Sequence, residues 1–507
     1  MNAKVIGISV LLLALCGFLS IYTPESFLKG NNIENLLRRT SMYGILGIGV
    51  AFVIITSGID LSIGSLVCLV GCLLASFLQV DYRPFGLQDV AAVNAQDQTI
   101  TVRGGTEFDV GDHIRYYGGR RARNLVAKVT AVQSDQLDDG TSTTKLTIDQ
   151  KPSRDDEDGS VAKLVSVASY QKAAKTASGD EKLPTVVIDE SLNGVAARDQ
   201  IWFVHPKSGL KQLQIVDSVV GNGKTTVTVN DTLGDFGSEW YAVPLERRQR
   251  FSIPVALGAV LGIALLLGVL HGLLITRLKL PPFVVTLCGL LFYRGFSRWL
   301  VDDQTMGFGN EFDDSLRLLG TGKLPIWEAA DGGDSFGIPY PFFVLLFVAI
   351  VAIVFLNRTV WGRYMLALGR NEEAARYSGI NTNRMTLVAY VISAVLAAVG
   401  GMLFALDSNS IAPSSFGNFY ELYAIAAAVL GGCSLRGGEG GIIGVVIGTA
   451  VMQTLYNLIV LMKISDKLEF AIIGAVILLG VIADELVKRL AAKRRAAARA
   501  RQAAEQP

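Results

Sequence analysis

Long apolar runs alternate along the chain with short polar connections, and one long polar stretch divides these runs into two groups. A helix that crosses a bilayer needs about 20 mainly apolar residues. On this criterion the sequence predicts about ten transmembrane helices, at residues 5–22, 41–57, 61–80, 253–275, 283–300, 339–356, 385–406, 421–433, 441–461 and 469–487. We therefore expect a multi-pass membrane protein whose natural surroundings are the lipid bilayer.

The polar stretch at 81–250 has a different periodicity, because apolar and polar residues alternate there in strand fashion. Thr99-Ile100-Thr101-Val102 is one example, and alternation with a period of two is typical of half-buried strands. The segments 108–149 and 195–231 each read as strand, turn, long strand, hairpin and strand. The sequence thus predicts an all-β insert, composed of two small β modules in tandem.

Together these patterns predict the fold class: an all-α polytopic membrane protein with an inserted extracytoplasmic all-β domain. Four segments follow along the chain. They are the first part of the transmembrane domain with three helices (1–80), the β-rich insert (81–250), the second part with seven helices (251–487), and a basic tail (488–507).

Loop charges predict the orientation, since cytoplasmic loops of membrane proteins are enriched in Lys and Arg. The loops 276–282 and 357–384 and the tail 488–507 are basic, whereas the loop 301–338 is rich in Asp and Glu. With ten helices, this pattern places both termini and the 357–384 loop in the cytoplasm. It places the 81–250 insert outside.

Composition excludes several classes of function. Half of the 507 residues are hydrophobic, only 18% are charged, and the net charge of +1 indicates no nucleic-acid partner. The five cysteines lack the spacing of a zinc site, so we predict no bound metal. The stretch 221–226 (GNGKTT) resembles the end of a phosphate-binding loop, but Ser218 stands where that loop needs glycine. We therefore expect no nucleotide site and no catalytic residues.

The segment TSGIDLSIG at 56–64 places a carboxylate between two apolar runs. A charged side chain near the middle of a bilayer costs about 2.5–3.5 kcal/mol on insertion scales, so Asp60 should face a cavity or a helix end. Ser57 or Asp60 could cap the following helix by accepting its free amide hydrogens. Contact between Asp60 and a solute is the alternative, and the sequence alone leaves both open.

The basic loop contains a short helix signal at 369–380. Asn371 can cap a helix whose first turn holds Glu372 and Glu373, and Gly379 can end it. A short helix on the membrane surface suits docking into a groove of a partner protein. A plain surface loop is the simpler interpretation. A glycine-rich break at 431–441 would allow close approach of helices, or form a tight turn.

Four blocks of sequence resemble the permease subunits of ribose, xylose and galactoside ABC importers. They are VIITSGIDLSIGSL (53–66), LHGLLITRLKLPPFVVTLCGLLFYRG (270–295), WGRYMLALGRNEEAARYSGI (361–380) and AAVLGGCSLRGGEGGIIGVVIGT (427–449). The resemblance covers most of the chain outside 81–250, and the insert is the departure from it. It implies a bacterial inner-membrane complex of two permease subunits (a second copy or a paralogue), two cytoplasmic ABC ATPase subunits and an extracytoplasmic solute-binding protein.

The resemblance also implies roles for residues. The segment 369–380 matches the family's coupling loop, which docks on the ATPase; the residues assigned to it are Gly369, Asn371, Glu372, Glu373, Ala374, Ala375 and Gly379. Gly58, Asp60 and Ser62 match a signature near the pathway. ATP and Mg would be bound by the partner ATPase, and this chain would hold no cofactor.

We therefore predict a permease that imports a monosaccharide or similar polar solute by alternating access, with no covalent chemistry of its own. Related permeases carry branched-chain amino acids or nucleosides, which is one alternative. An ion-coupled secondary transporter is another, although it would need paired intramembrane carboxylates and Asp60 stands nearly alone. A membrane-anchored envelope protein acting through its insert is the third. The resemblance assigns no role to residues 81–250.

Overall fold

The computed structural model describes the larger part of the chain. The described residues are 3–84, 86–104, 108–118, 124–136, 142–156, 159–171, 174–175, 181–192, 199–205, 209–231, 240–328, 335–465, 468, 471–476, 478 and 482. They form two compact units, one composed of Met1–Gln79 with Phe251–Pro507 and the other of Val80–Arg250. We call them the helical unit and the β unit.

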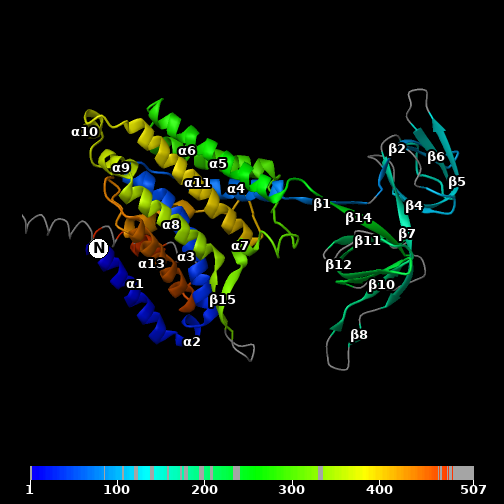
Figure 1. The fold of residues 1–507 in the computed structure, drawn as a ribbon, viewed down its shortest axis with the longest axis horizontal. Coiled ribbons are helices and arrows are strands. Elements are labelled where there is room, and N and C mark those ends of the chain that lie inside the picture. Colours follow the sequence, from blue (N-terminus) through cyan, green and yellow to red (C-terminus); the bar gives the residue numbers. More distant parts are fainter. Residues whose placement is uncertain are drawn as a thin grey trace, which may run out of the picture. The chain divides into compact units, whose positions relative to one another are not determined.

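The helical unit is built from helices that run side by side (Figure 1). They are α1 (Ala3–Tyr22), α2 (Pro24–Phe27), α3 (Gly30–Ile55), α4 (Ile63–Phe77), α5 (Ile253–Thr276), α6 (Pro282–Leu300), α7 (Leu318–Thr321), α8 (Tyr340–Arg358), α9 (Val360–Arg370), α10 (Glu372–Tyr377), α11 (Thr382–Ser408), α12 (Tyr420–Leu430) and α13 (Ile442–Leu461). A hairpin of β15 (Lys323–Glu328) and β16 (Ser335–Pro339) follows α7.

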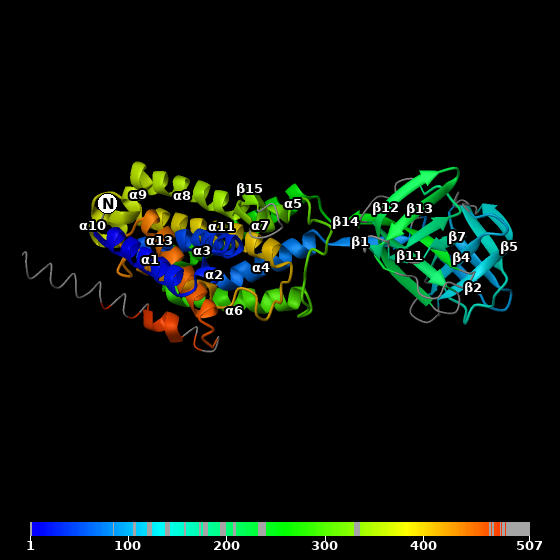
Figure 2. The same cartoon turned by 90° about the horizontal axis from the view of Figure 1, so that it is seen from below.

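Helix α3 forms the centre of this unit. It is buried from Thr40 to Ile55 and contacts α11, α13, α12 and α8. Helices α8, α11 and α13 lie beside it in both views (Figures 1 and 2). Glycines permit this packing: a side chain at Gly49 would meet Ser393 and Leu396 of α11. In contrast, α1, α5 and α8 expose large apolar side chains such as Leu13, Leu266 and Phe347, as lipid-facing helices do.

The β unit consists of antiparallel strands. They are β1 (Val80–Pro84), β2 (Gln88–Asn94), β3 (Thr99–Arg103), β4 (His113–Gly118), β5 (Leu125–Gln136), β6 (Ser142–Ile148), β7 (Gly159–Gln171), β8 (Ala174–Lys175), β9 (Glu181–Lys182), β10 (Thr185–Ile188), β11 (Gln200–His205), β12 (Gly209–Gly221), β13 (Lys224–Val229) and β14 (Tyr241–Gln249). Twelve join one sheet in the order β1-β14-β11-β12-β13-β10-β7-β2-β3-β6-β5-β4, and β8 pairs with β9 separately.

Three hydrophobic clusters lie in the described part of the β unit. One gathers side chains between residues 90 and 161, a second gathers side chains between 165 and 242, and a smaller one contains Leu164, Val204, Val243 and Leu245. Alternation along the strands produces them, as in β13, where Thr225, Val227 and Val229 are buried while the residues between them are less so. The first and last strands pair antiparallel, with Val80 opposite Gln249. The chain therefore enters and leaves the β unit through one two-stranded ribbon.

The predicted fold class is wrong. A twelve-stranded sheet makes the chain a mixed α and β protein rather than an essentially all-α one, and the described residues hold six helices long and apolar enough to span a bilayer, not about ten. These six are Val5–Tyr22, Gly30–Ile55, Ile253–Thr276, Tyr340–Arg358, Thr382–Ser408 and Ile442–Leu461.

The missing spans have physical explanations. Helix α4 has only 15 residues, because the chain passes into β1 soon after Phe77. Helix α12 has 11, since it begins after the left-handed Phe419 and ends at the glycine pair that starts with Gly431. Helix α6 carries Arg294 and Arg298, which lower its hydropathy. The predicted helix at 469–487 lies largely outside the described residues, and the basic tail at 488–507 lies outside them entirely.

Candidate functional site

The loop between α8 and α11 folds into two short helices, α9 and α10. The side chain of Asn371 caps α10, because its Oδ1 accepts a hydrogen bond from the backbone N–H of Ala374 at 2.9 Å. Glu372 pairs with Arg376 one turn later, at 2.9 Å. Gly379 takes a positive φ of 81° and ends the segment. These interactions give a short, separately capped surface helix.

The residues predicted for coupling divide into an outer and an inner set. Asn371, Glu372, Glu373, Ala374 and Gly379 are exposed, whereas Gly369 and Ala375 are buried. Tyr377, at the end of α10, is 91% exposed. The exposed set offers two carboxylates and an aromatic ring to a partner, while the buried set attaches the segment to the helical unit.

The attachment is a close backbone contact around Gly369. A Cβ atom at this position would collide with the carbonyl oxygen of Ile55, at the end of α3, and with the backbone nitrogen of Gly438. These two groups also bind each other, since the N–H of Gly438 donates to the carbonyl of Ile55 at 2.9 Å. Ends of α9 and α3 and the glycine-rich 431–441 stretch thus meet at one point, which we call the glycine junction.

Ser57 completes the glycine junction from the α3 side. Its hydroxyl lies 3.2 Å from the carbonyl oxygen of Gly369 and 3.0 Å from that of Arg436. From the other side, the Nε of Arg370 donates to the carbonyl oxygen of Gly438 at 3.4 Å. Polar contacts therefore tie α9 both to the turn that follows α3 and to the loop that precedes α13.

Asp60 lies three residues beyond Ser57 and is 3% exposed. Its Oδ1 accepts hydrogen bonds from the backbone N–H of Ser62 at 3.0 Å and from its hydroxyl at 2.7 Å. Its Oδ2 accepts from the hydroxyl of Ser393 in α11 at 2.9 Å. Asp60 and Ser62 thus lie together, and the carboxylate joins the turn before α4 to the middle of α11.

The backbone of this turn is also fixed by hydrogen bonds. The carbonyl oxygen of Ile59 accepts from the hydroxyl of Tyr390 at 3.2 Å and from that of Thr286 at 3.3 Å. A Cβ atom at Gly58 would lie 2.7 Å from the Tyr390 oxygen, so glycine is required there. We call residues 58–62 with Tyr390 and Ser393 the Asp60 turn, which links α4, α6 and α11.

Sequence reasoning did not identify Ser57, Tyr390 or Ser393. Tyr390 and Ser393 stand three residues apart in the mainly apolar middle of α11, which places them on one face of that helix. That spacing is the signal that could have identified them. Ser57 was considered only as a cap, and its partners are backbone carbonyl groups of residues more than 300 positions later in the chain. Local sequence patterns do not predict hydrogen bonds between residues so distant along the chain.

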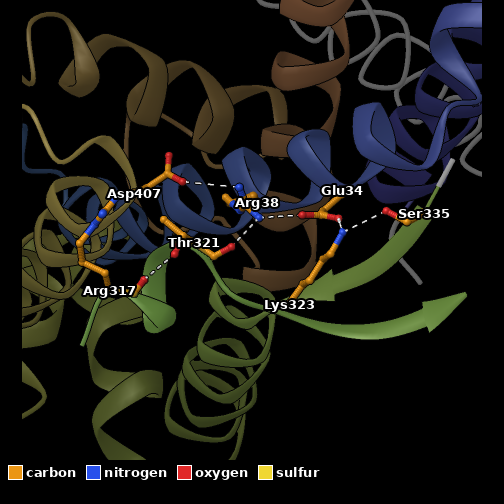
Figure 3. Close-up of polar contacts among 7 residues, drawn as sticks. All are labelled: Glu34, Arg38, Arg317, Thr321, Lys323, Ser335 and Asp407. Carbon is orange, nitrogen blue, oxygen red and sulfur yellow. Dashed lines mark hydrogen bonds and ion pairs between the residues drawn. The ribbon is translucent and has the colours of Figure 1, made fainter. Parts of the chain in front are cut away.

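A network of charges lies at the other end of α3 (Figure 3). Arg38 binds the carboxylate of Glu34 at 2.8 Å, and Lys323 of the β15–β16 hairpin binds its second oxygen at 3.0 Å. Arg38 also donates to the carbonyl oxygen of Thr321 at 2.9 Å. With a rise of about 1.5 Å per residue, this network lies roughly 30 Å along α3 from the glycine junction.

The residues of the site are connected to one another across the helical unit. Within the described residues, no group of three or more His, Cys, Asp or Glu side chains could hold a metal ion. The contacts instead form a continuous path from α10 through the glycine junction to the Asp60 turn. A displacement of α10 would therefore reach α3, α4 and α11 through backbone contacts and short polar bonds.

Comparison with known proteins gave a family and several relatives. The family model described as "Branched-chain amino acid transport system / permease component" matches residues 220–481. The ribose import permease protein of Escherichia coli K12 is 34% identical over 230 residues, which cover 45% of this chain and 68% of that protein. The fructose import permease protein of Rhizobium meliloti is 30% identical over 250 residues (48% and 66%).

A third relative extends the range of these proteins. The xylose transport system permease protein of Haemophilus influenzae is 28% identical over 289 residues, which cover 47% of this chain and 76% of that protein. No solved structure matches the chain.

Proposed function

Because this chain belongs to the family of branched-chain amino acid transport system permease components, we propose that it is the membrane-spanning permease subunit of an ATP-driven sugar importer. The observation that carries the proposal is the contact path from the exposed helix α10 to the buried Asp60 turn. An ATP-hydrolysing partner needs such a path, since its force must reach helices embedded in lipid.

The proposed substrate is a monosaccharide. The relatives at 28–34% identity are named for ribose import, fructose import and xylose transport. The family description mentions branched-chain amino acids, but the four sequence blocks at 53–66, 270–295, 361–380 and 427–449 favour the sugar permeases. The substrate would cross as an intact molecule, with no bond made or broken.

We place the coupling role on α10 and its flanks. Glu372 and Glu373 at the start of α10 would meet the cytoplasmic ATPase, which binds the ATP and Mg. Gly369 and Ala375 would hold the helix to the permease, because both are buried. Gly58, Asp60 and Ser62 would receive the displacement and pass it to α4 and α11. In this proposal Asp60 positions helices and does not carry the solute.

The other partners and the location follow the same scheme. The chain would lie in a bacterial inner membrane, with α10 and both termini in the cytoplasm and residues 81–250 outside. Two permease subunits would enclose the pathway, and an extracytoplasmic binding protein would deliver the sugar. The basic residues around α9 and α10, namely Arg358, Arg363, Arg370, Arg376 and Arg384, support the cytoplasmic placement.

Transport would proceed by alternating access. ATP-driven closure of the partner subunits would push α10, shift the end of α3 at the glycine junction and rotate α4 and α11 about the Asp60 turn. The sugar can favour one state only through different affinity for the two states, so the pathway should bind it weakly.

ATP-dependent uptake tests the proposal. The full chain, co-purified with its ABC ATPase, reconstituted into liposomes and supplied with its solute-binding protein on the opposite side of the membrane, should accumulate labelled ribose, xylose or fructose only when ATP and Mg are present on the side of the ATPase. Labelled leucine in the same liposomes tests the amino-acid alternative. Equal sugar entry without an ATPase would refute the importer.

A further inference from the structure

A carboxylate at the charged end of α3 has unused capacity to accept hydrogen bonds. Asp407, near the end of α11, keeps 30% of its side chain exposed. Within the described residues its ion-pair partner is Arg38, whose Nη1 lies 3.7 Å from Oδ1, beyond hydrogen-bond distance (Figure 3), and Arg39 and Arg317 interact with it electrostatically. Arg38 instead forms its short ion pair with Glu34, at 2.8 Å. Both oxygens of Asp407 are therefore available to a hydroxyl donor.

Donors with spare capacity lie beside this carboxylate. The Nε of Arg38 is buried without a hydrogen-bond partner. Arg39 is exposed, stacks over the ring of Tyr456 at 5.0 Å, and interacts electrostatically with Asp407. A carboxylate and the exposed guanidinium of Arg39 thus occur together, whereas the neighbouring Glu34 is paired with Arg38 and Lys323.

Aromatic rings form the adjacent surface. Tyr420, the first residue of α12, is partly exposed and interacts electrostatically with Arg39 and Asp407. The buried rings of Tyr43 and Phe404 support it, with ring centres 5.0 and 4.7 Å from its own. Such packing leaves the ring little rotational freedom, because it is enclosed on its inner side.

We propose that Asp407, Arg39 and Tyr420 form a subsite that binds a monosaccharide at the end of the helical unit opposite α10. A sugar ring presents C–H groups that pack on an aromatic face, and hydroxyls that donate to a carboxylate and accept from a guanidinium. Tyr43 and Phe404 position Tyr420. The inference rests on the proposed sugar transport, and it assigns the solute's contacts to residues that no sequence motif indicated.

The proposed subsite also gives a reason for the partly buried carboxylate of Asp407, whose loss of water costs free energy. A half-buried carboxylate without a hydrogen bond loses water without full compensation, and such a group is normally paired. Arg38, Arg39 and Arg317 all interact electrostatically with Asp407, but the nearest nitrogen of Arg38, at 3.7 Å, is too distant to donate a hydrogen bond. A sugar hydroxyl between Asp407 and Arg39 would donate a hydrogen bond to the carboxylate and accept one from the guanidinium.

Saturation-transfer NMR on the purified full chain in nanodiscs tests the subsite, since it detects weak binding. The probes are D-ribose, D-xylose and D-fructose, offered singly to the wild type and to Asp407→Asn and Arg39→Gln. The matched control is Asp303→Asn, an exposed carboxylate that already binds Arg298. We expect signal from at least one sugar in the wild type and the control, and a loss of about fivefold or more in both variants.

Two results would overturn the subsite: no signal from any of the three sugars with the wild type, or full signal in both Asp407→Asn and Arg39→Gln. Gel filtration and thermal unfolding check that each variant folds. If Asp407→Asn does not fold, Arg39→Gln decides, because Arg39 is exposed. ATP-dependent uptake without any NMR signal would refute the subsite and leave the importer intact, whereas absent uptake would refute the importer.

Discussion

Replacing Gly369 by alanine adds one methyl group at the narrowest point of the proposed force path. The new Cβ would occupy the space between the carbonyl oxygen of Ile55 and the backbone of Gly438. Both obstacles are backbone atoms, so no side-chain rotation can relieve the clash. Either α9 moves away from α3, or the hydrogen bond from Gly438 to Ile55 opens.

The expected cost follows from these two terms. Overpacking a well-filled site typically costs about 1–3 kcal/mol, and a lost internal hydrogen bond adds about 0.5–1.5 kcal/mol. A sum near 2 kcal/mol or more would lower the population of the coupled arrangement by more than tenfold, since 1.4 kcal/mol corresponds to a factor of ten. ATP-dependent uptake by Gly369→Ala should therefore fall at least tenfold.

The assay compares uptake with ATP hydrolysis in proteoliposomes that contain the co-purified ATPase. Gly441→Ala is the matched control, because a Cβ there meets nothing within 4 Å and the φ of −155° suits any residue. We expect Gly441→Ala to transport like the wild type, and Gly369→Ala to lose uptake while its ATPase subunit still hydrolyses ATP. Normal uptake by Gly369→Ala would refute the force path.

Three further predictions use the same preparation. Asp60→Asn should lower the thermal unfolding temperature, because one of the three hydrogen bonds to the carboxylate must reverse and the others weaken, at a cost of about 1–3 kcal/mol; Asp303→Asn should not. Asn371→Ala should reduce uptake several-fold by removing an N-cap worth about 0.5–2 kcal/mol, and Asn371→Asp should restore it; equal uptake by all three chains would count against α10. Lys323→Met should destabilise the helical unit by about 1–3 kcal/mol, because buried Glu34 then keeps Arg38 alone; an unchanged unfolding temperature would contradict the role of this network.

Local patterns predicted the local parts of the site. Asn371, Glu372, Glu373 and Gly379 carry capping and termination signals within nine residues, and the structure has the helix and the Asn371 cap at these positions. Their coupling role stays a prediction. The glycine junction could not be predicted in this way, because Ser57 and Gly369 are brought together by packing between distant segments.

Counting apolar runs overestimated the number of spanning helices for a related reason. The predicted span at 61–80 contains the 15-residue helix α4, which ends at Phe77, and the chain enters β1 at Val80. Counting apolar residues does not mark where a helix ends inside such a run, because Leu78 and Val80 are as apolar as the helix that precedes them. The β alternation, by contrast, is a local property, and residues 99–103 and 224–229 do form strands.

Photo-crosslinking at α10 tests most directly whether an ATPase acts on this helix. A photoreactive phenylalanine would replace Tyr377, which is 91% exposed, and in a second chain Tyr22, which is 67% exposed at the end of α1. In the complex with the co-purified ABC ATPase, we predict a covalent adduct to the ATPase from position 377 and none from position 22. An adduct from position 22 with none from position 377 would contradict the account.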